Sequence, residues 1–136
     1  MSFLPLHLQP GVDLRRALET PMAEQGCEAT FIVSGIGSLD QARLRLAGAA
    51  EELELNGALE VLTLAGSVAM NGSHLHASLA NAQGRVLGGH LYYGCRVRTT
   101  AEVLLALLPD WHFRRECDAA TGYGELAPRR REGLPG

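Results

Sequence analysis

The sequence contains no lysine, and all twelve of its basic residues are arginine. Because 15 residues are acidic, the formal net charge is −3 at pH 7 with the histidines neutral. A protein built mainly to hold nucleic acid needs a basic surface that neutralises phosphates. The charge balance therefore argues against that class, although an arginine-rich face on an oligomer can still act locally.

Cysteine is scarce as well, and Cys27, Cys95 and Cys117 form no C-x-x-C pair. This spacing excludes a disulfide framework and a cysteine-based zinc site, so we expect free thiols in a reducing cytoplasm. No apolar run approaches the roughly 18 residues of a membrane span, and the N-terminus lacks the pattern of a signal peptide. We therefore expect a cytoplasmic protein that does not insert into a membrane.

With 136 residues, of which 46% are hydrophobic, the chain is long enough for one packed domain. Asp13 is placed to cap a helix over residues 13–25, Pro21 predicts a kink or break inside it, and Gly26 predicts its end. Alternating or β-branched stretches predict the strands 3–9, 30–33, 42–46, 58–69, 73–80, 85–93 and 112–117, with a weaker one at 52–55.

Residues 99–108 have a helical composition but also suit a buried strand, so their own pattern leaves both structures open. The sum of the elements favours a compact α+β domain with a mostly antiparallel sheet and one main N-terminal helix. We place the domain at residues 1–128 and expect a flexible C-terminal tail at 129–136.

Three of the five histidines, His74, His76 and His90, fall within seventeen residues of one another. On a strand, His74 and His76 point to the same face. If residues 82–84 form a three-residue loop with Gly84 in the left-handed conformation, His76 lies directly opposite His90. A loop of two or four residues puts His90 on the other face, so the type of turn decides whether the three imidazoles meet. The glycine pair at 88–89 then leaves room for crowded imidazoles or for the backbone of a neighbouring subunit.

Three neutral imidazoles suit zinc or a similar first-row divalent ion, with a fourth position open to water. Water activated there is a starting point for hydrolytic chemistry. The alternative is that these are ordinary strand histidines on a solvated face. The two remaining histidines, His7 and His112, have no partner in the sequence and are interpreted as surface or satisfied core residues.

At this point several stretches together resemble a known family, the plants-and-prokaryotes-conserved (PPC) domain, over residues 6–128. The matching stretches are PGVDL at 10–14, SGIGSL at 34–39, LEVLTLAGS at 59–67, GSHLHASLA at 72–80, GRVLGGHL at 84–91, GCRVRTTAEV at 94–103 and TGYGEL at 121–126. The histidine-containing stretches are the most specific, and they resemble the stand-alone prokaryotic members.

The resemblance implies an α+β fold assembled as a homotrimer, with residues 99–108 in a strand. It also implies a metal site, usually zinc, at His74, His76 and His90. Plant relatives bind DNA through AT-hooks with an Arg-Gly-Arg core, a sequence that this chain lacks. A DNA-binding function therefore rests on analogy with the family.

Three functional hypotheses follow: a metal-binding PPC protein that acts as a DNA-binding or regulatory module, a metalloenzyme of hydrolase or lyase type, and a purely structural histidine cluster at a subunit interface. An enzyme requires a pocket at the metal with a titratable neighbour. The polar residues that flank the histidine motif are Glu60, Ser67, Ser78 and Arg96. A DNA-binding protein requires a continuous arginine face, with Arg43, Arg45, Arg96, Arg98 and the Arg129–Arg131 run as its candidates.

Overall fold

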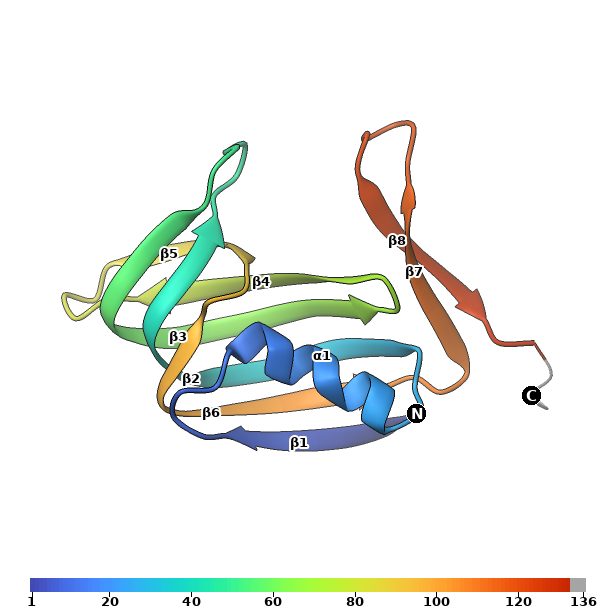
Figure 1. Ribbon diagram of the computed structural model, residues 1–136, viewed down its shortest axis with the longest axis horizontal. Helices are drawn as coiled ribbons and strands as arrows, with labels where there is room; N and C mark the ends of the chain where they lie inside the picture. Colours follow the sequence, from blue (N-terminus) through green and yellow to red (C-terminus); the bar gives the residue numbers. More distant parts are fainter. Residues whose placement is uncertain (133–136) are drawn as a thin grey trace.

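A six-stranded antiparallel sheet and a separate two-stranded hairpin make up most of the molecule (Figure 1). The computed structural model describes residues 1–132. In chain order the elements are β1 (Ser2–Leu8), α1 (Leu14–Glu24), β2 (Ala29–Arg45), β3 (Leu53–Ala69), β4 (Gly72–Ala80), β5 (Val86–Leu91), β6 (Arg96–Leu107), β7 (Trp111–Cys117) and β8 (Gly124–Arg130). The large sheet has the order β1-β6-β2-β3-β4-β5, and β7 pairs with β8. The predicted α+β class is confirmed.

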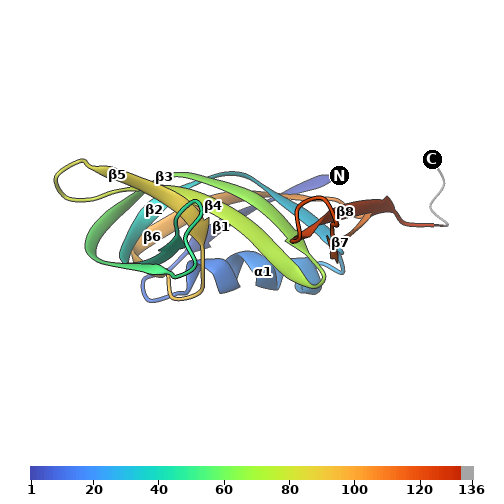
Figure 2. The ribbon, with the colours of Figure 1, turned by 90° about the horizontal axis from the view of Figure 1, so that it is seen from above.

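Helix α1 covers one face of the large sheet and leaves the other face without a helix (Figure 2). The side chain of Asp13 caps it by accepting a hydrogen bond from Arg16 N–H at 3.1 Å. Leu14, Leu18 and Met22 are buried against the sheet. The expected break at Pro21 does not occur, because α1 continues for three residues beyond it. Within residues 1–132, no helix is long and apolar enough to cross a bilayer.

Strands β2 and β3 are each 17 residues long, although the sequence predicted two separate strands in each place. The residues between the predicted strands 30–33 and 42–46 are part of β2, with shifts in its register against β6. Such bulges add a residue to one strand without ending its ladder. At Gly37, a Cβ would lie 2.7 Å from Ala101 Cα, so the glycine permits the close approach of β6.

Residues of the ambiguous stretch 99–108 form most of strand β6, as the family resemblance implies. This strand lies between β1 and β2 in the sheet. Its inward side chains, including Val103 and Leu105, are buried in the core. Pairing on both edges therefore outweighs the helical composition of residues 99–108.

The C-terminal tail begins later than expected, because β8 extends to Arg130. In the register with β7, Arg129 lies opposite His112 and Arg130 lies opposite Trp111. The guanidinium of Arg129 also binds Glu116 at 2.7 Å. The tail prediction is therefore wrong for these two arginines, and its last part, residues 133–136, lies outside the described residues.

The three cysteines are free thiols, as expected, and they differ sharply in accessibility. Cys27 and Cys95 are buried, and burial raises the pKa of the Cys95 thiol to about 11. Cys117 is exposed at the end of β7. We expect a thiol-specific chromogenic disulfide to react rapidly with one cysteine of the native protein, and the Cys117→Ser variant to lose this fast phase. A fast phase of two thiols would contradict the packing around Cys95.

Candidate metal centre

The turn between β4 and β5 has the conformation that brings the histidines together. Gly84 has a φ of +76°, and Asn81 N–H donates to Arg85 O at 2.9 Å. The Asn81 side-chain oxygen accepts hydrogen bonds from the backbone N–H groups of Gln83 and Arg85, both at 3.0 Å. In the resulting register His76 lies opposite His90. The register predicted from the three-residue loop is therefore confirmed.

The three imidazoles lie on the face of the sheet opposite α1 and form one compact cluster. The Nε2 atoms of His74 and His76 are 3.0 Å apart, and the ligand atoms of all three histidines lie within 4.8 Å of one another. In a tetrahedral zinc site, Zn–N bonds of about 2.0–2.1 Å place two nitrogens about 3.3 Å apart. The distance between the His74 and His76 nitrogens is close to this spacing, and the His90 ligand atom lies near enough for the three to share one ion. The residues present therefore fit a three-histidine ion site.

The glycines before His90 have a different role from the expected one. A Cβ at Gly89 would lie 2.5 Å from Arg45 O, and a Cβ at Gly88 would lie 3.1 Å from Ala77 O. The space beside them is therefore filled by the backbone of β2 and β4 in the same chain. It is not reserved for the imidazoles or for a neighbouring subunit. The close approach at Gly89 allows β5 to pair with β2 at Arg45 and His90.

The surroundings of two of the imidazoles favour their neutral form. Partial burial lowers the pKa of His74, and His76 and Arg115 lower it further by charge repulsion. Partial burial also lowers the pKa of His90, and charge repulsion from His76 and Arg45 lowers it further. A histidine binds a metal ion through its neutral form. The surroundings therefore favour the form of His74 and His90 that binds metal.

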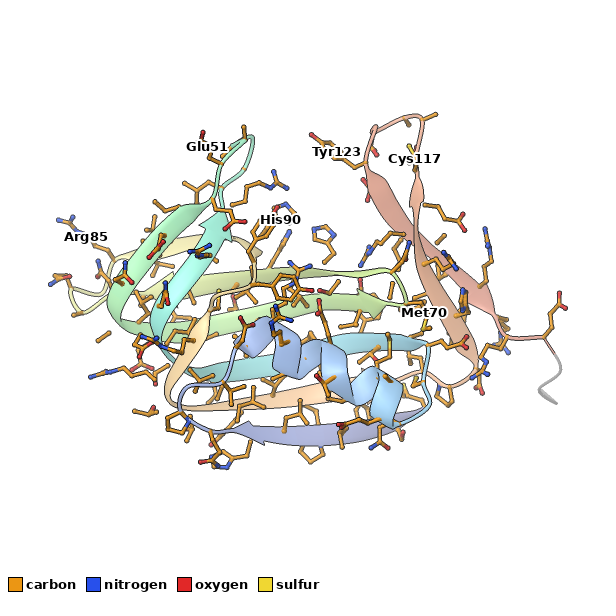
Figure 3. The ribbon with its side chains drawn as sticks, viewed as in Figure 1. Glu51, Met70, Arg85, His90, Cys117 and Tyr123 are labelled. Carbon is orange, nitrogen blue, oxygen red and sulfur yellow. The ribbon has the colours of Figure 1, made fainter. Side chains whose placement is uncertain are left out.

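A cavity of about 530 Å³ opens beside His74 and His90. One wall is formed by Arg45 and the turn after β2, and the other by the β7–β8 hairpin. Figure 3 shows His90 between the turn that carries Glu51 and the hairpin tip that carries Tyr123. The cavity is lined by Arg45, Gly48, Ala49, Ser73, His74, His90, Arg115, Tyr123, Gly124 and Glu125. The histidine cluster is therefore accessible from a space in which a small molecule can bind.

A smaller cavity of about 330 Å³ lies on the other side of His74 and includes His76 and Ser67. Arg115 and Glu125 border both cavities. The hairpin therefore presents one basic and one acidic side chain to both cavities.

Of the four polar candidates from the sequence, only Ser67 lies at the cluster. Ser78 shares a hydrogen bond with Thr63 at 2.6 Å, and Arg96 binds Asp40 at 2.7 Å. Glu60 lines a separate hollow. The sequence interpretation did not assign Arg115, Tyr123 or Glu125 to the site, although two of them belong to the TGYGEL stretch at 121–126.

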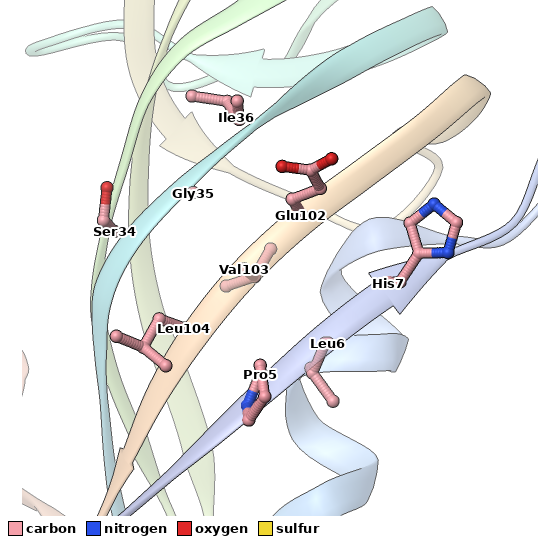
Figure 4. A pocket seen from close by; sticks show the side chains of 9 residues that line it. All are labelled: Pro5, Leu6, His7, Ser34, Gly35, Ile36, Glu102, Val103 and Leu104. Atoms are coloured by element: carbon pink, nitrogen blue, oxygen red, sulfur yellow. The ribbon is translucent and has the colours of Figure 1, made fainter.

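The two other histidines lie away from the cluster, as expected. His112 Nδ1 is 2.8 Å from the Glu28 carboxylate. His7 borders a larger hollow of about 650 Å³ on the outer surface of β1, β6 and β2 (Figure 4). This hollow is lined mainly by apolar side chains, and Glu102 is the acidic residue at its rim. It is therefore separate from the candidate ion site.

The proposed arginine face is largely neutralised by carboxylates. Arg43 lies 3.5 Å from Glu54, and Arg96 and Arg129 each have a carboxylate oxygen at 2.7 Å. Arg45 points instead toward the histidine cavity, where it bonds to Tyr92 Oη. These side chains do not form the continuous free arginine surface that DNA binding would require.

Comparisons with known proteins connect both the fold and the histidine segment to one family. The family model of the Plants and Prokaryotes Conserved (PCC) domain, the PPC family named above, matches residues 1–109. The bifunctional protein GlmU of Synechococcus sp. (strain JA-3-3Ab) is 49% identical over 122 residues, which are 90% of this chain and 20% of that protein. The chain thus spans about a fifth of the length of this curated relative.

Solved structures share the same fold over nearly their whole length. A hypothetical protein from Salmonella cholerae-suis is 36% identical with a TM-score of 0.92, over 96% of this chain and 94% of that one. A metal-containing protein from Archaeoglobus fulgidus is 30% identical with a TM-score of 0.81, over 93% and 94% of the two chains. A Ralstonia eutropha structure whose name suggests DNA binding is 20% identical with a TM-score of 0.78, over 96% and 90%. At that identity it shows the fold alone.

Proposed function

The chain belongs to the Plants and Prokaryotes Conserved domain family, and we propose that it is a metal-binding member of it. In this proposal His74, His76 and His90 bind a divalent ion, zinc or a similar first-row metal. The observation that carries it is the register that sets His76 opposite His90, with His74 Nε2 3.0 Å from His76 Nε2. A structurally similar protein from Archaeoglobus fulgidus is described as metal-containing, which supports the same proposal.

The cavity beside the cluster supports a site that meets small molecules rather than a closed structural ion. Three protein ligands leave at least one position of a tetrahedral ion open, and structural zinc sites usually have four. The second candidate is therefore a metalloenzyme of hydrolase or lyase type. The observation in its favour is the Glu125 carboxylate, which lines the same cavity as His74 and His90. An ion held there would polarise a substrate oxygen and lower the pKa of bound water.

DNA binding, or a regulatory role at DNA, is the third candidate and rests on analogy with the family. The net charge of −3 and the paired arginines give it little support. An oligomer that brings unpaired arginines of several copies together would be its remaining physical basis. We therefore place it after the metal-based functions.

We propose that the protein is cytoplasmic and assembles as a homotrimer. Five large apolar side chains on strands β1, β2 and β3 of the large sheet are 40–57% exposed, and several of them lie on the face that α1 leaves free. These five residues are Phe3, Phe31, Val33, Ile36 and Leu62. Phe3 on β1 and Phe31 on β2 lie opposite the same residue of β6, Ala106, which places them on one face of the sheet on either side of that residue. A group of exposed apolar residues is typical of an interaction surface. Because His74 and His76 share the face, the ion site would adjoin the interface.

Native mass spectrometry tests the ion and the assembly in one measurement. After purification without chelators and addition of Zn²⁺, we expect the mass of three chains with one bound ion per chain. Acid denaturation should then release the metal and give the mass of a single chain. A metal-free spectrum after zinc addition would contradict the ion site, and a monomer mass would contradict the trimer.

A further inference from the structure

Arg115 is held beside the histidine cluster by contacts to strand β3 and to the turn between β3 and β4. Its backbone N–H donates to the Asn71 side-chain oxygen at 2.7 Å, and the Asn71 amide donates to Arg115 O at 3.0 Å. Its guanidinium donates to Ser67 Oγ at 2.6 Å. Because Ser67 lies opposite His74 in the β3–β4 register, the guanidinium is fixed next to His74.

The guanidinium of Arg115 has a hydrogen-bond donor for which residues 1–132 supply no acceptor. Its Nε atom is buried and has no hydrogen-bond partner, and Arg115 forms none of the ion pairs found in residues 1–132. Burial also lowers the pKa of the Arg115 guanidinium. A buried donor without an acceptor is destabilising, and more so when the group is charged. Such a donor is typical of a site where an acceptor arrives with a ligand.

A second guanidinium faces the same cavity from the opposite wall. Arg45 lies opposite His90 in the β2–β5 register and is oriented by hydrogen bonds to Tyr92 Oη at 3.1 Å and to Ala49 O at 3.3 Å. The cavity therefore has arginine on both sides of the histidines. Arginine binds planar oxyanions through two parallel hydrogen bonds, which makes it the usual residue for carboxylate and phosphate recognition.

One carboxylate, Glu125, also lines the cavity. Its Oε1 accepts a hydrogen bond from the Thr121 hydroxyl at 3.0 Å, which orients it within the hairpin. Against two guanidinium groups and a bound divalent ion, this single negative charge leaves the cavity positive. An anionic ligand is therefore favoured over a neutral or cationic one.

We propose that the cavity binds a small oxyanion, a carboxylate or a phosphate group, between Arg115, Arg45 and the ion held by the three histidines. This inference rests on the proposed metal site and names the class of ligand that the site takes. The anion would occupy the open position of the ion and accept a hydrogen bond from Arg115. Arg115 is thus a ligand-binding residue, and Asn71 and Ser67 are positioning residues.

The test uses Co²⁺ in place of zinc, because the visible spectrum of Co²⁺ reports both the histidine ligands and any anion that joins them. Acetate and inorganic phosphate are the two probes, and chloride at equal ionic strength is the comparison. We expect a saturable spectral change with at least one oxyanion and none with chloride over the same range. Whichever probe binds more tightly distinguishes a carboxylate site from a phosphate site.

Arg115→Met keeps the length of the side chain and removes its charge, and Arg114→Met is the matched control on the exposed face of the same strand. We expect Arg115→Met to weaken oxyanion binding by about 10- to 100-fold, the loss typical of charge-assisted hydrogen bonds, with the metal-only spectrum unchanged. Arg114→Met should bind as the wild type does. Arg115→Lys keeps a charge but loses the planar pair of donors, and we expect it to bind weakly as well.

Equal affinity in Arg115→Met and Arg114→Met would overturn the inference, as would a Co²⁺ spectrum that no oxyanion alters. If the wild type bound no Co²⁺, the metal proposal would fail separately. In that event, phosphate-dependent thermal stabilisation of the metal-free protein would decide the inference. Stabilisation that is lost in Arg115→Met would support it, and equal stabilisation of both variants would overturn it.

Discussion

His76→Ala is expected to lower the affinity for zinc by about 100-fold or more, because the loss of even an outer partner of a ligating histidine costs about 10- to 100-fold. His76 is central to the cluster, since it lies opposite His90 and its Nε2 is 3.0 Å from that of His74. At a zinc concentration 100 times the dissociation constant, the ion stabilises the native protein by about 2.7 kcal/mol. A 100-fold weaker site retains only about 0.4 kcal/mol at the same concentration. Thermal unfolding with and without zinc measures the difference.

His7→Ala is the control for this variant, because His7 is exposed on β1 and lies outside the cluster. It should keep the full zinc-dependent stabilisation. His74→Ala and His90→Ala should behave as His76→Ala does. A full metal load in both His74→Ala and His90→Ala would show that the assignment of ligands is wrong.

Gly66→Ala is expected to have the largest effect on stability. Gly66 has a φ of +145°, and a Cβ there would lie 2.1 Å from His74 O and 2.8 Å from Leu75 Cα. Both contacts are with backbone atoms of β4, which cannot move without disturbing the sheet. Strain and overpacking together predict a loss of about 3 kcal/mol or more in the free energy of unfolding. For a domain of this size, that lowers the midpoint of thermal unfolding by roughly 10 °C.

Gly57→Ala separates the steric contribution from the backbone one. Gly57 also has a positive φ, +110°, but a Cβ there meets nothing within 4 Å. It should therefore lose only the free energy of the unfavourable backbone conformation, about 1 kcal/mol. Circular dichroism during heating compares the two variants. Equal shifts would contradict the close approach of β4 at Gly66.

The histidine cluster could be predicted from the sequence because its geometry is local. His74 and His76 are two residues apart on one strand, and a short turn with glycine at position 84 fixes which residue faces His76. Strand alternation and turn type are both encoded by neighbouring residues. No long-range information was needed to bring His90 to its place.

The wall of the cavity that the β7–β8 hairpin forms could not be predicted in the same way. Arg115 is 41 positions after His74, and it reaches the cluster only because Asn71 and Ser67 bind it across separate elements. Such contacts depend on how the β7–β8 hairpin packs, which the alternation within a strand does not encode. The length of β2 was missed for a related reason. Its register shifts lie along its pairing with β6, and residues 30–33 and 42–46 alone indicated two separate strands.

The ion ligands and the hairpin wall of the cavity lie on parts of the fold with separate hydrogen-bond ladders. All three histidines belong to the six-stranded sheet and to the segment matched by the family model, whereas Arg115, Tyr123 and Glu125 lie on or at the tip of the β7–β8 hairpin, beyond residue 109. Substitutions in the hairpin can therefore change which molecule is selected while affinity for the ion stays constant. Evolution can vary chemical specificity on this scaffold without rebuilding its inorganic centre.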